Sequence, residues 1–176
     1  GVHIDDHLGT AGSLWLGSCY CDRCVSEFRD YLRNLPPGSV HVTIDSPATF
    51  DFRHALKKWL SDNPGRTFSD HPLWPEYRIF QLQGAAKFMA ELRELAATTA
   101  GHAVPLSANA GLTWGPHLND YLSLDFFSAE IEHHAAAGKM SDDPVVAYRL
   151  ADAVGRPLAA TASGSDWAFI KEKNLP

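Results

Sequence analysis

Short apolar segments of period two alternate along the chain with longer segments of helical period. Val2 and Ile4 are β-branched and one residue apart, which predicts a short buried strand at the start. Three further strands are expected at 103–109, 121–130 and 157–162. Because helical segments alternate with most of these strands, this order predicts parallel βαβ units and an α/β fold.

Apolar residues three and four positions apart predict three helices, at 22–33, 76–100 and 143–155. Asp22 is expected to cap the first of these helices, and Gly101 is expected to end the second. The residues expected to face inward are Val25, Phe28, Leu32, Ile79, Leu82, Ala86, Met89, Leu92, Ala96, Val146, Leu150 and Val154.

The stretch 36–75 is rich in proline and aromatic residues and is expected to form an irregular excursion from the domain. A short helix is expected within it, around 51–61. Its aromatic side chains can stack on a sugar ring or pack the excursion onto the rest of the domain, and we favour packing. These residues are Phe50, Phe52, Trp59, Phe68 and Trp74.

The totals fit one globular domain over residues 1–176, with 45% hydrophobic residues. A net charge of −6 argues against nucleic acid or an anionic membrane as partner. No apolar run approaches the roughly 20 residues that cross a bilayer. Four strands are half of a (β/α)8 barrel, which needs roughly 250 residues, so we favour half a barrel over a small doubly wound sheet. The chain lacks an initiator Met, opens within a strand and is expected to be an excerpt of a longer protein.

Polar residues follow the predicted strands at the point where each strand ends. Asp5 and Asp6 come directly after the first strand, and His7 comes next. Asn109 and Glu130 end the second and third strands. In parallel α/β proteins the functional groups sit at the carboxyl ends of strands, and acids there are costly unless they are used or paired. The sequence therefore predicts a functional site at this edge of the sheet.

Three cysteines lie within six residues: Cys19, Cys21 and Cys24. This spacing is too tight for an ordinary disulfide framework and is more typical of a metal site. Three thiolates leave one position of a tetrahedron for a fourth ligand. The sequence thus predicts a structural zinc that clamps a loop, with free thiols at the start of a helix as the alternative. No organic cofactor is expected.

The pattern Cys19-Tyr20-Cys21, Cys24 and Phe28-Arg29 with Leu32 resembles the zinc-binding cysteine cluster of family 42 β-galactosidases. The resemblance implies a barrel running from strand four to about strand seven, with Asp5-Asp6 standing where that family has Asn-Glu. Ser107-Ala108-Asn109 and Ser128-Ala129-Glu130 are similar to the ends of its fifth and sixth strands. The resemblance also places the remaining cysteine ligand upstream of Gly1. The opening segment is similar to the Asp-Asp strand end of uncharacterised glycosidase-like barrels.

Glycoside hydrolysis normally uses two carboxyl groups, and Asp6 and Glu130 are the expected pair. Asp6 would be the nucleophile or base, and Glu130 the proton donor. Asp5 would orient Asp6 or bind a substrate hydroxyl. The other expected sugar contacts are His7, Asn109 and Trp167. Asp stands at position 6 where the family has Glu, and the segment 160–164 contains no Glu where the nucleophile would stand.

Two other functions are compatible with these residues. His3, Asp5, Asp6 and His7, together with the segment 132–134, supply enough ligands for a metal-dependent hydrolase. A carbohydrate-binding barrel that has lost catalysis would explain why the last strand ends without a Glu. The expected partner is a carbohydrate in each glycan-binding alternative, and a homo-oligomer is compatible with a barrel of this type.

Overall fold

The structure is a computed structural model, and it describes residues 1–5, 8–40, 42–44, 46–109, 123–131 and 143–162. For residues 129–131, 143–144 and 161–162 it describes the backbone alone. The chain divides into two compact units. The first, called here the sheet unit, contains residues 1–8 and 85–176, and the second, the cysteine unit, contains residues 9–84.

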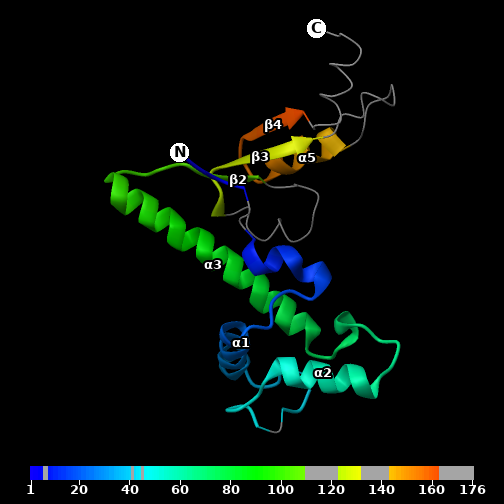
Figure 1. Cartoon of the computed structure of the whole chain (residues 1–176). Coiled ribbons are helices and arrows are strands. Elements are labelled where there is room, and N and C mark those ends of the chain that lie inside the picture. The colour runs from blue at the N-terminus through cyan, green and yellow to red at the C-terminus, as the bar shows by residue number, and fades with distance from the viewer. Residues whose placement is uncertain (6–7, 41, 45, 110–122, 132–142, 163–176) are drawn as a thin grey trace. The chain divides into compact units, whose positions relative to one another are not determined.

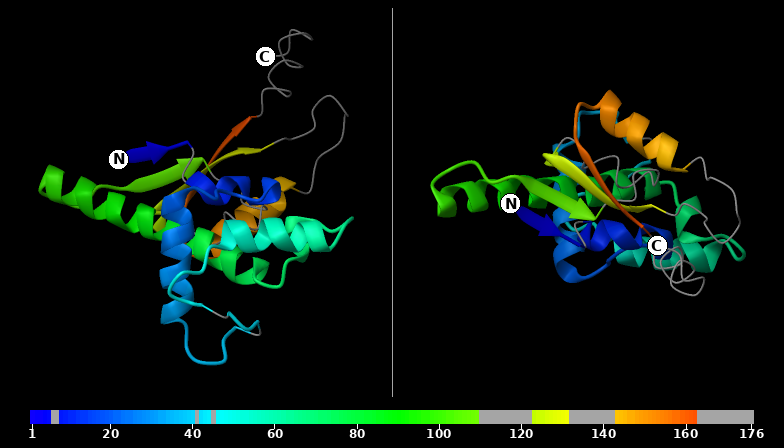
Figure 2. Two further views of the ribbon diagram at one scale, coloured as in Figure 1. Left: turned by 60° about the horizontal axis from the view of Figure 1, so that its bottom comes forward. Right: turned by 90° about the horizontal axis from the view of Figure 1, so that it is seen from above.

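The sheet unit contains a four-stranded parallel sheet (Figure 1). Its strands are adjacent in chain order, and their arrows point the same way (Figure 2). The predicted α/β class with parallel strands is therefore confirmed. The strands are β1 (Val2–Ile4), β2 (Leu106–Asn109), β3 (Phe126–Ile131) and β4 (Leu158–Ala162).

Strand alternation gives this sheet one apolar face and one polar face. The apolar face and two helices share one core cluster, to which α3 (Trp74–Ala100) contributes Met89 and α5 (Asp143–Ala153) contributes Ala147 and Ala151. The strand residues of this cluster are Val2, Ile4, Leu106, Ala108, Phe127, Leu158 and Ala160. Both helices therefore cover the same face of the sheet. By register the other face carries His3, Ser107, Asn109, Phe126, Ser128 and Ala159.

The buried faces of α3 and α5 differ slightly from those that the sequence predicts. Ile79 is 47% exposed and Val146 is 49% exposed, so both predictions were wrong. On α5 the small residues Ala147 and Ala151 are buried instead, because they let the helix approach the sheet closely. On α3 the buried positions follow a spacing of four residues: Tyr77, Gln81, Ala85 and Met89.

The predicted third strand begins later than expected, at Phe126. Asp125 precedes it and accepts a hydrogen bond from the backbone amide of Leu106 at 2.8 Å. Its other oxygen accepts from Arg93 at 2.9 Å, and Arg93 also donates to the Ser123 carbonyl. This network joins the start of β2 and the residues before β3 to α3.

We expect Asp125→Ala to destabilise the sheet unit by about 1–2 kcal/mol, because it removes two charge-assisted hydrogen bonds at a partly exposed site. Burial alone would raise the pKa of Asp125, but the bonds from Arg93 and the Leu106 amide outweigh it and lower that pKa. The contribution is therefore present above pH about 4 and is lost as pH falls through the folded pKa. Chemical denaturation at pH 7 and pH 3 measures this difference. Asp152→Asn, at an exposed position of α5, should leave both values unchanged.

The cysteine unit is helical and has its own core. It contains η1 (Gly9–Leu16), α1 (Asp22–Asn34), α2 (Phe52–Asp62), η2 (Phe68–Asp70) and the first part of α3. The helices predicted at 22–33 and 51–61 are confirmed, and the stretch predicted as an excursion lies within this unit. The buried residues of the core are Phe28, Phe52, Leu56, Leu73 and Tyr77.

The aromatic residues of the excursion pack within the cysteine unit. Phe52 is fully buried, and Phe50, Phe68 and Trp74 pack against the same core. Trp59 lies edge-on to His71, with ring centroids 5.4 Å apart. These aromatic side chains therefore pack against one another and against the core of the cysteine unit.

The predicted cap of the first helix was wrong by one residue. Cys21 occupies the N-cap position of α1, and Asp22 is the first helical residue. Asp22 pairs instead with Arg53 of α2, at 2.9 Å. The cap of α2 is Asp51, whose carboxylate accepts from the His54 amide at 3.0 Å.

Acidification is expected to destabilise the cysteine unit through His71. This side chain is 7% exposed, its Nδ1 accepts from the Leu73 amide at 3.0 Å, and its ring lies edge-on to Phe52 and Trp59. Burial lowers the pKa of His71. In the unfolded chain this histidine binds a proton below pH about 6.5, whereas in the folded chain it stays neutral down to its lower pKa. The free energy of unfolding therefore falls as the pH drops from about 6.5 to the pKa of the folded state.

The slope is at most about 1.4 kcal/mol per pH unit, and unfolding by urea between pH 7.5 and pH 5 measures it. His71→Asn keeps an acceptor near the position of Nδ1 and cannot titrate, so it should flatten the profile. His102→Asn, at an exposed position, serves as the control and should keep the wild-type slope. A wild-type profile that is already flat over this range would contradict the prediction.

Among the described residues, no helix has both the length and the apolar character that a membrane span requires.

Candidate functional site

Two polar side-chain pairs join β1 to β2 on the polar face of the sheet unit. The first pair is His3 and Ser107, with Nδ1 and Oγ 2.7 Å apart. The second pair is Asp5 and Asn109, in which the amide nitrogen donates to the carboxylate at 3.0 Å. Because Ile4 is opposite Ala108 in the register, the two pairs lie one layer apart. The carboxyl ends of the two strands therefore meet in an acid–amide contact.

The sequence-predicted site residues fall into three groups. Asp5 and Asn109 are brought together as described above. Glu130 lies in β3 with its Cα opposite that of Thr161 in β4, and its side chain is outside the described atoms. The remaining three, Asp6, His7 and Trp167, lie outside the described residues, as does the segment 132–134 of the metal-hydrolase alternative.

The polar face carries an exposed carboxylate at the carboxyl end of β1. Asp5 is exposed at its carboxyl edge, and none of the described residues on this face is a lysine or an arginine. Asn109 and Ser128, which are opposite each other in the register, add neutral donors and acceptors. Such a surface can bind hydroxyl groups.

Sequence reasoning missed the contact between His3 and Ser107. Both residues were visible, but their pairing depends on the register between strands about a hundred residues apart. Ser107 shares strand parity with Asn109, and a serine at that position of an apolar strand was the available signal.

The second candidate site is the cysteine cluster of the cysteine unit. The sulfur atoms of Cys19, Cys21 and Cys24 all lie within 4.8 Å of one another. Tetrahedral zinc with bonds of about 2.3 Å needs sulfurs about 3.8 Å apart, so a small contraction of the cluster would suffice. Among the described residues this is the one group of three donors close enough to hold a metal ion. The predicted grouping of the three cysteines is confirmed.

The local environment shifts the pKa values of Cys21 and Cys24 in opposite directions. Cys21 is exposed at the N-cap of α1, and a hydrogen bond from the Cys24 backbone amide is the largest effect lowering its pKa. Burial, together with the neighbouring thiols, raises the pKa of Cys24 to about 12. The three thiols lie close enough together for a soft divalent cation to bind them, and such a cation would convert them to thiolates.

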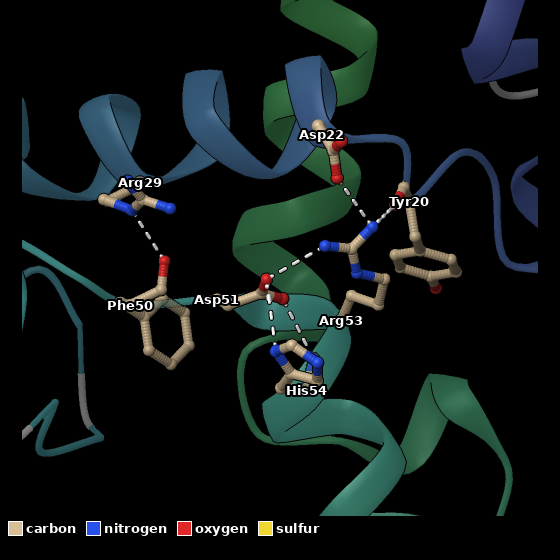
Figure 3. Close-up of polar contacts among 7 residues, drawn as sticks. All are labelled: Tyr20, Asp22, Arg29, Phe50, Asp51, Arg53 and His54. Atoms are coloured by element: carbon tan, nitrogen blue, oxygen red, sulfur yellow. Dashed lines mark hydrogen bonds and ion pairs between the residues drawn. The ribbon is translucent and has the colours of Figure 1, made fainter.

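Side chains from α2 and α3 hold the cysteine loop in place. The Tyr77 hydroxyl donates to the Cys19 carbonyl, and the Tyr20 ring stacks on Tyr77 with centroids 5.3 Å apart. Arg53 donates to the Tyr20 carbonyl at 3.3 Å and also binds Asp22 (Figure 3). The loop is therefore supported at Cys19 and Tyr20 before any metal binds.

The chain reverses direction just before the cysteines. Gly17 has φ +98° and Ser18 has φ +66°, both in the left-handed region. The Ser18 side chain donates to the Thr10 carbonyl at 2.7 Å, and its amide donates to the Ser13 carbonyl at 2.9 Å. These bonds compensate the strain at Ser18 and direct the chain into the cluster.

A cavity of about 410 Å³ lies beside the end of α1 in the cysteine unit. Its lining combines Arg29 and Arg33 with aliphatic residues and prolines from the segment 35–50. None of the described residues that line it is an acid, a histidine or a cysteine, and none of them belongs to either candidate site.

Fold and sites define an α/β protein whose parallel sheet has polar strand ends, joined to a helical unit with a three-cysteine cluster. Comparisons with protein-family models, with curated proteins and with solved structures gave no match.

Proposed function

We propose that the chain is part of a glycoside hydrolase barrel that cleaves O-glycosyl bonds with Asp6 and Glu130. The observation that carries this proposal is the hydrogen bond between Asn109 and Asp5. It joins the carboxyl ends of two adjacent parallel strands, and Asp6 directly follows. Glu130 lies near the end of β3, the strand next to β2, and this position supports its assignment to the same edge.

The topology supports half of a (β/α)8 barrel over a doubly wound sheet. The strand order β1-β2-β3-β4 follows the chain without reversal. Helices α3 and α5 contribute to a core on the same face of the sheet. A doubly wound sheet reverses its strand order and carries helices on both faces, whereas a barrel keeps all its helices outside. The polar face would then be the barrel interior.

The roles follow from position. Asp6 is the nucleophile or base and Glu130 the proton donor, while Asp5 and Asn109 bind substrate hydroxyls. The site is proposed to favour neutral sugars over uronic acids, because the exposed carboxylate of Asp5 would repel a uronate held at the acid–amide pair.

For the cysteine unit we propose that Cys19, Cys21 and Cys24 hold a structural zinc ion. The support is the spacing of the three sulfurs and the preformed loop around them. Zinc at this position would clamp the loop to the start of α1.

The test is hydrolysis of matched glycosides by the purified protein. We expect cleavage of nitrophenyl glycosides of neutral hexoses or pentoses. The kcat/KM for the matching uronides should be at least tenfold lower, because the uronate carboxylate would make one unfavourable contact with a charge of the same sign. Equal cleavage of both would contradict the charge argument. Binding of neutral glycosides without cleavage would replace the hydrolase proposal by a carbohydrate-binding barrel. Activity lost to a chelator without unfolding of the cysteine unit would favour a metal-dependent hydrolase.

A further inference from the structure

His3 and Ser107 form an unusual pair on the polar face of the sheet. They are directly opposite in the register of β1 and β2, and their side chains are 2.7 Å apart. Ser107 is completely buried, whereas His3 is exposed. A buried hydroxyl therefore holds one nitrogen of an imidazole whose ring remains open to solvent.

This arrangement leaves the second ring nitrogen available. Nδ1 is engaged by Ser107, and Nε2 of His3 has no hydrogen-bond partner among the described residues. His3 and Asp5 share strand parity, so the imidazole lies one layer below the contact between Asp5 and Asn109. A ligand bound by that acid–amide pair would be within reach of the ring.

We propose that His3 binds a hydroxyl group of the substrate through Nε2, and that Ser107 acts as a positioning residue that fixes the ring. This inference rests on the proposed function. If Ser107 donates to Nδ1, then Nε2 carries the proton and donates; if Nδ1 donates to Ser107, then Nε2 accepts. A hydroxyl group can do both, so it suits either tautomer. A carboxylate would suit only one of them and would lie beside Asp5.

The alternative role is purely structural, a clip between two strands. Two substitutions at position 3 separate the roles. His3→Asn places a polar atom near Nδ1, keeps the contact with Ser107 and removes Nε2. His3→Gln places a polar atom near Nε2 and gives up the contact with Ser107. Ser107→Ala leaves the imidazole and removes its support.

The experiment titrates the intact chain with the methyl β-glycosides of galactose, glucose and xylose. Calorimetry measures affinity, and side-chain ¹⁵N NMR follows the His3 nitrogens. For the tightest-binding glycoside we expect His3→Asn to weaken affinity about tenfold, the value of one lost hydrogen bond, without lowering the unfolding midpoint. His3→Gln should weaken it less than His3→Asn. Ser107→Ala should weaken it about threefold, and the Nε2 signal should shift on binding in the wild type.

Each outcome decides the inference. Affinity that is unchanged in His3→Asn, an Nε2 signal that does not move, or no glycoside binding at all would overturn it. The hydrolysis assay is scored separately: cleavage that persists unchanged in His3→Asn would leave the proposed function standing and reject the role of His3. Binding that depends on His3 in a protein that cleaves none of the glycosides would reject hydrolysis and keep this subsite.

Discussion

Asp6→Asn is expected to reduce glycoside hydrolysis by about 10³-fold or more while leaving sugar binding nearly intact. Asn has the shape of Asp but cannot act as nucleophile or base at neutral pH, and a missing group of this kind typically costs 10²–10⁴ in rate. Because binding relies on Asp5, Asn109 and the neighbouring hydroxyls, affinity should change by no more than about threefold. Turnover and calorimetry on the same protein measure the two effects.

Glu130→Gln should show a different signature, because a proton donor matters most when the leaving group is poor. We expect a loss of about 10³-fold on alkyl glycosides and a much smaller loss on nitrophenyl glycosides, whose leaving group needs little protonation. Asp152→Asn, a charge removal on the exposed side of α5, is the control and should keep wild-type activity. If Asp6→Asn and Glu130→Gln both remain fully active, the proposed catalytic pair is wrong.

The configuration of the first product gives an independent check on the same pair. Carboxyl groups roughly 5–5.5 Å apart produce retention, and a separation of about 6.5–9.5 Å produces inversion. Proton NMR of the released sugar, recorded before mutarotation, distinguishes the two. If the proposed pair is correct, the result also reports the separation between the carboxyl groups of Asp6 and Glu130.

The second large effect is expected at the cysteine cluster. The purified chain should contain one zinc ion, and removal of that ion should destabilise the cysteine unit by several kcal/mol, since the binding free energy of a structural zinc adds to the free energy of folding. Cys21→Ser and Cys24→Ser should each abolish binding at micromolar zinc. Elemental analysis and unfolding with and without a chelator measure these changes.

Two further variants locate the effect. Ser26→Ala, at an exposed position of α1, should retain both the zinc ion and the stability of the wild type. Tyr77→Phe keeps the buried ring and removes the hydroxyl that holds the Cys19 carbonyl, so it should lower zinc affinity by about tenfold. A chain that contains no metal, with an unfolding curve unaffected by Cys21→Ser, would rule out the zinc site and leave three free thiols.

Local sequence patterns predicted where some elements begin and end, but they did not predict which side of each helix is buried. The period-two pair Val2 and Ile4 lies in β1, and Gly101, with φ +71°, follows the last residue of α3. These features depend on the conformational preference of a few neighbouring residues. Ile79 and Val146 were misjudged because hydrophobicity alone cannot say which side of a helix meets a partner.

The candidate sites divide along the same line. The grouping of Cys19, Cys21 and Cys24 followed from spacing alone, because residues two to five apart around the start of a helix cannot lie far from one another. The contact between Asp5 and Asn109 was expected only as a shared edge of the sheet. Its realisation as a hydrogen bond, and the whole of the pair between His3 and Ser107, required the register of β1 against β2.

The sequence by itself determined the α/β class, the positions of the helices and strands to within a few residues, and the cysteine cluster, because all of these arise from short-range periodicity and spacing. The tertiary structure decided that the segment around the cysteines forms a unit with its own aromatic core. It also decided which face of the sheet is polar and which side chains meet there. Those features depend on contacts between residues far apart in the chain, and no local pattern encodes the register that creates them.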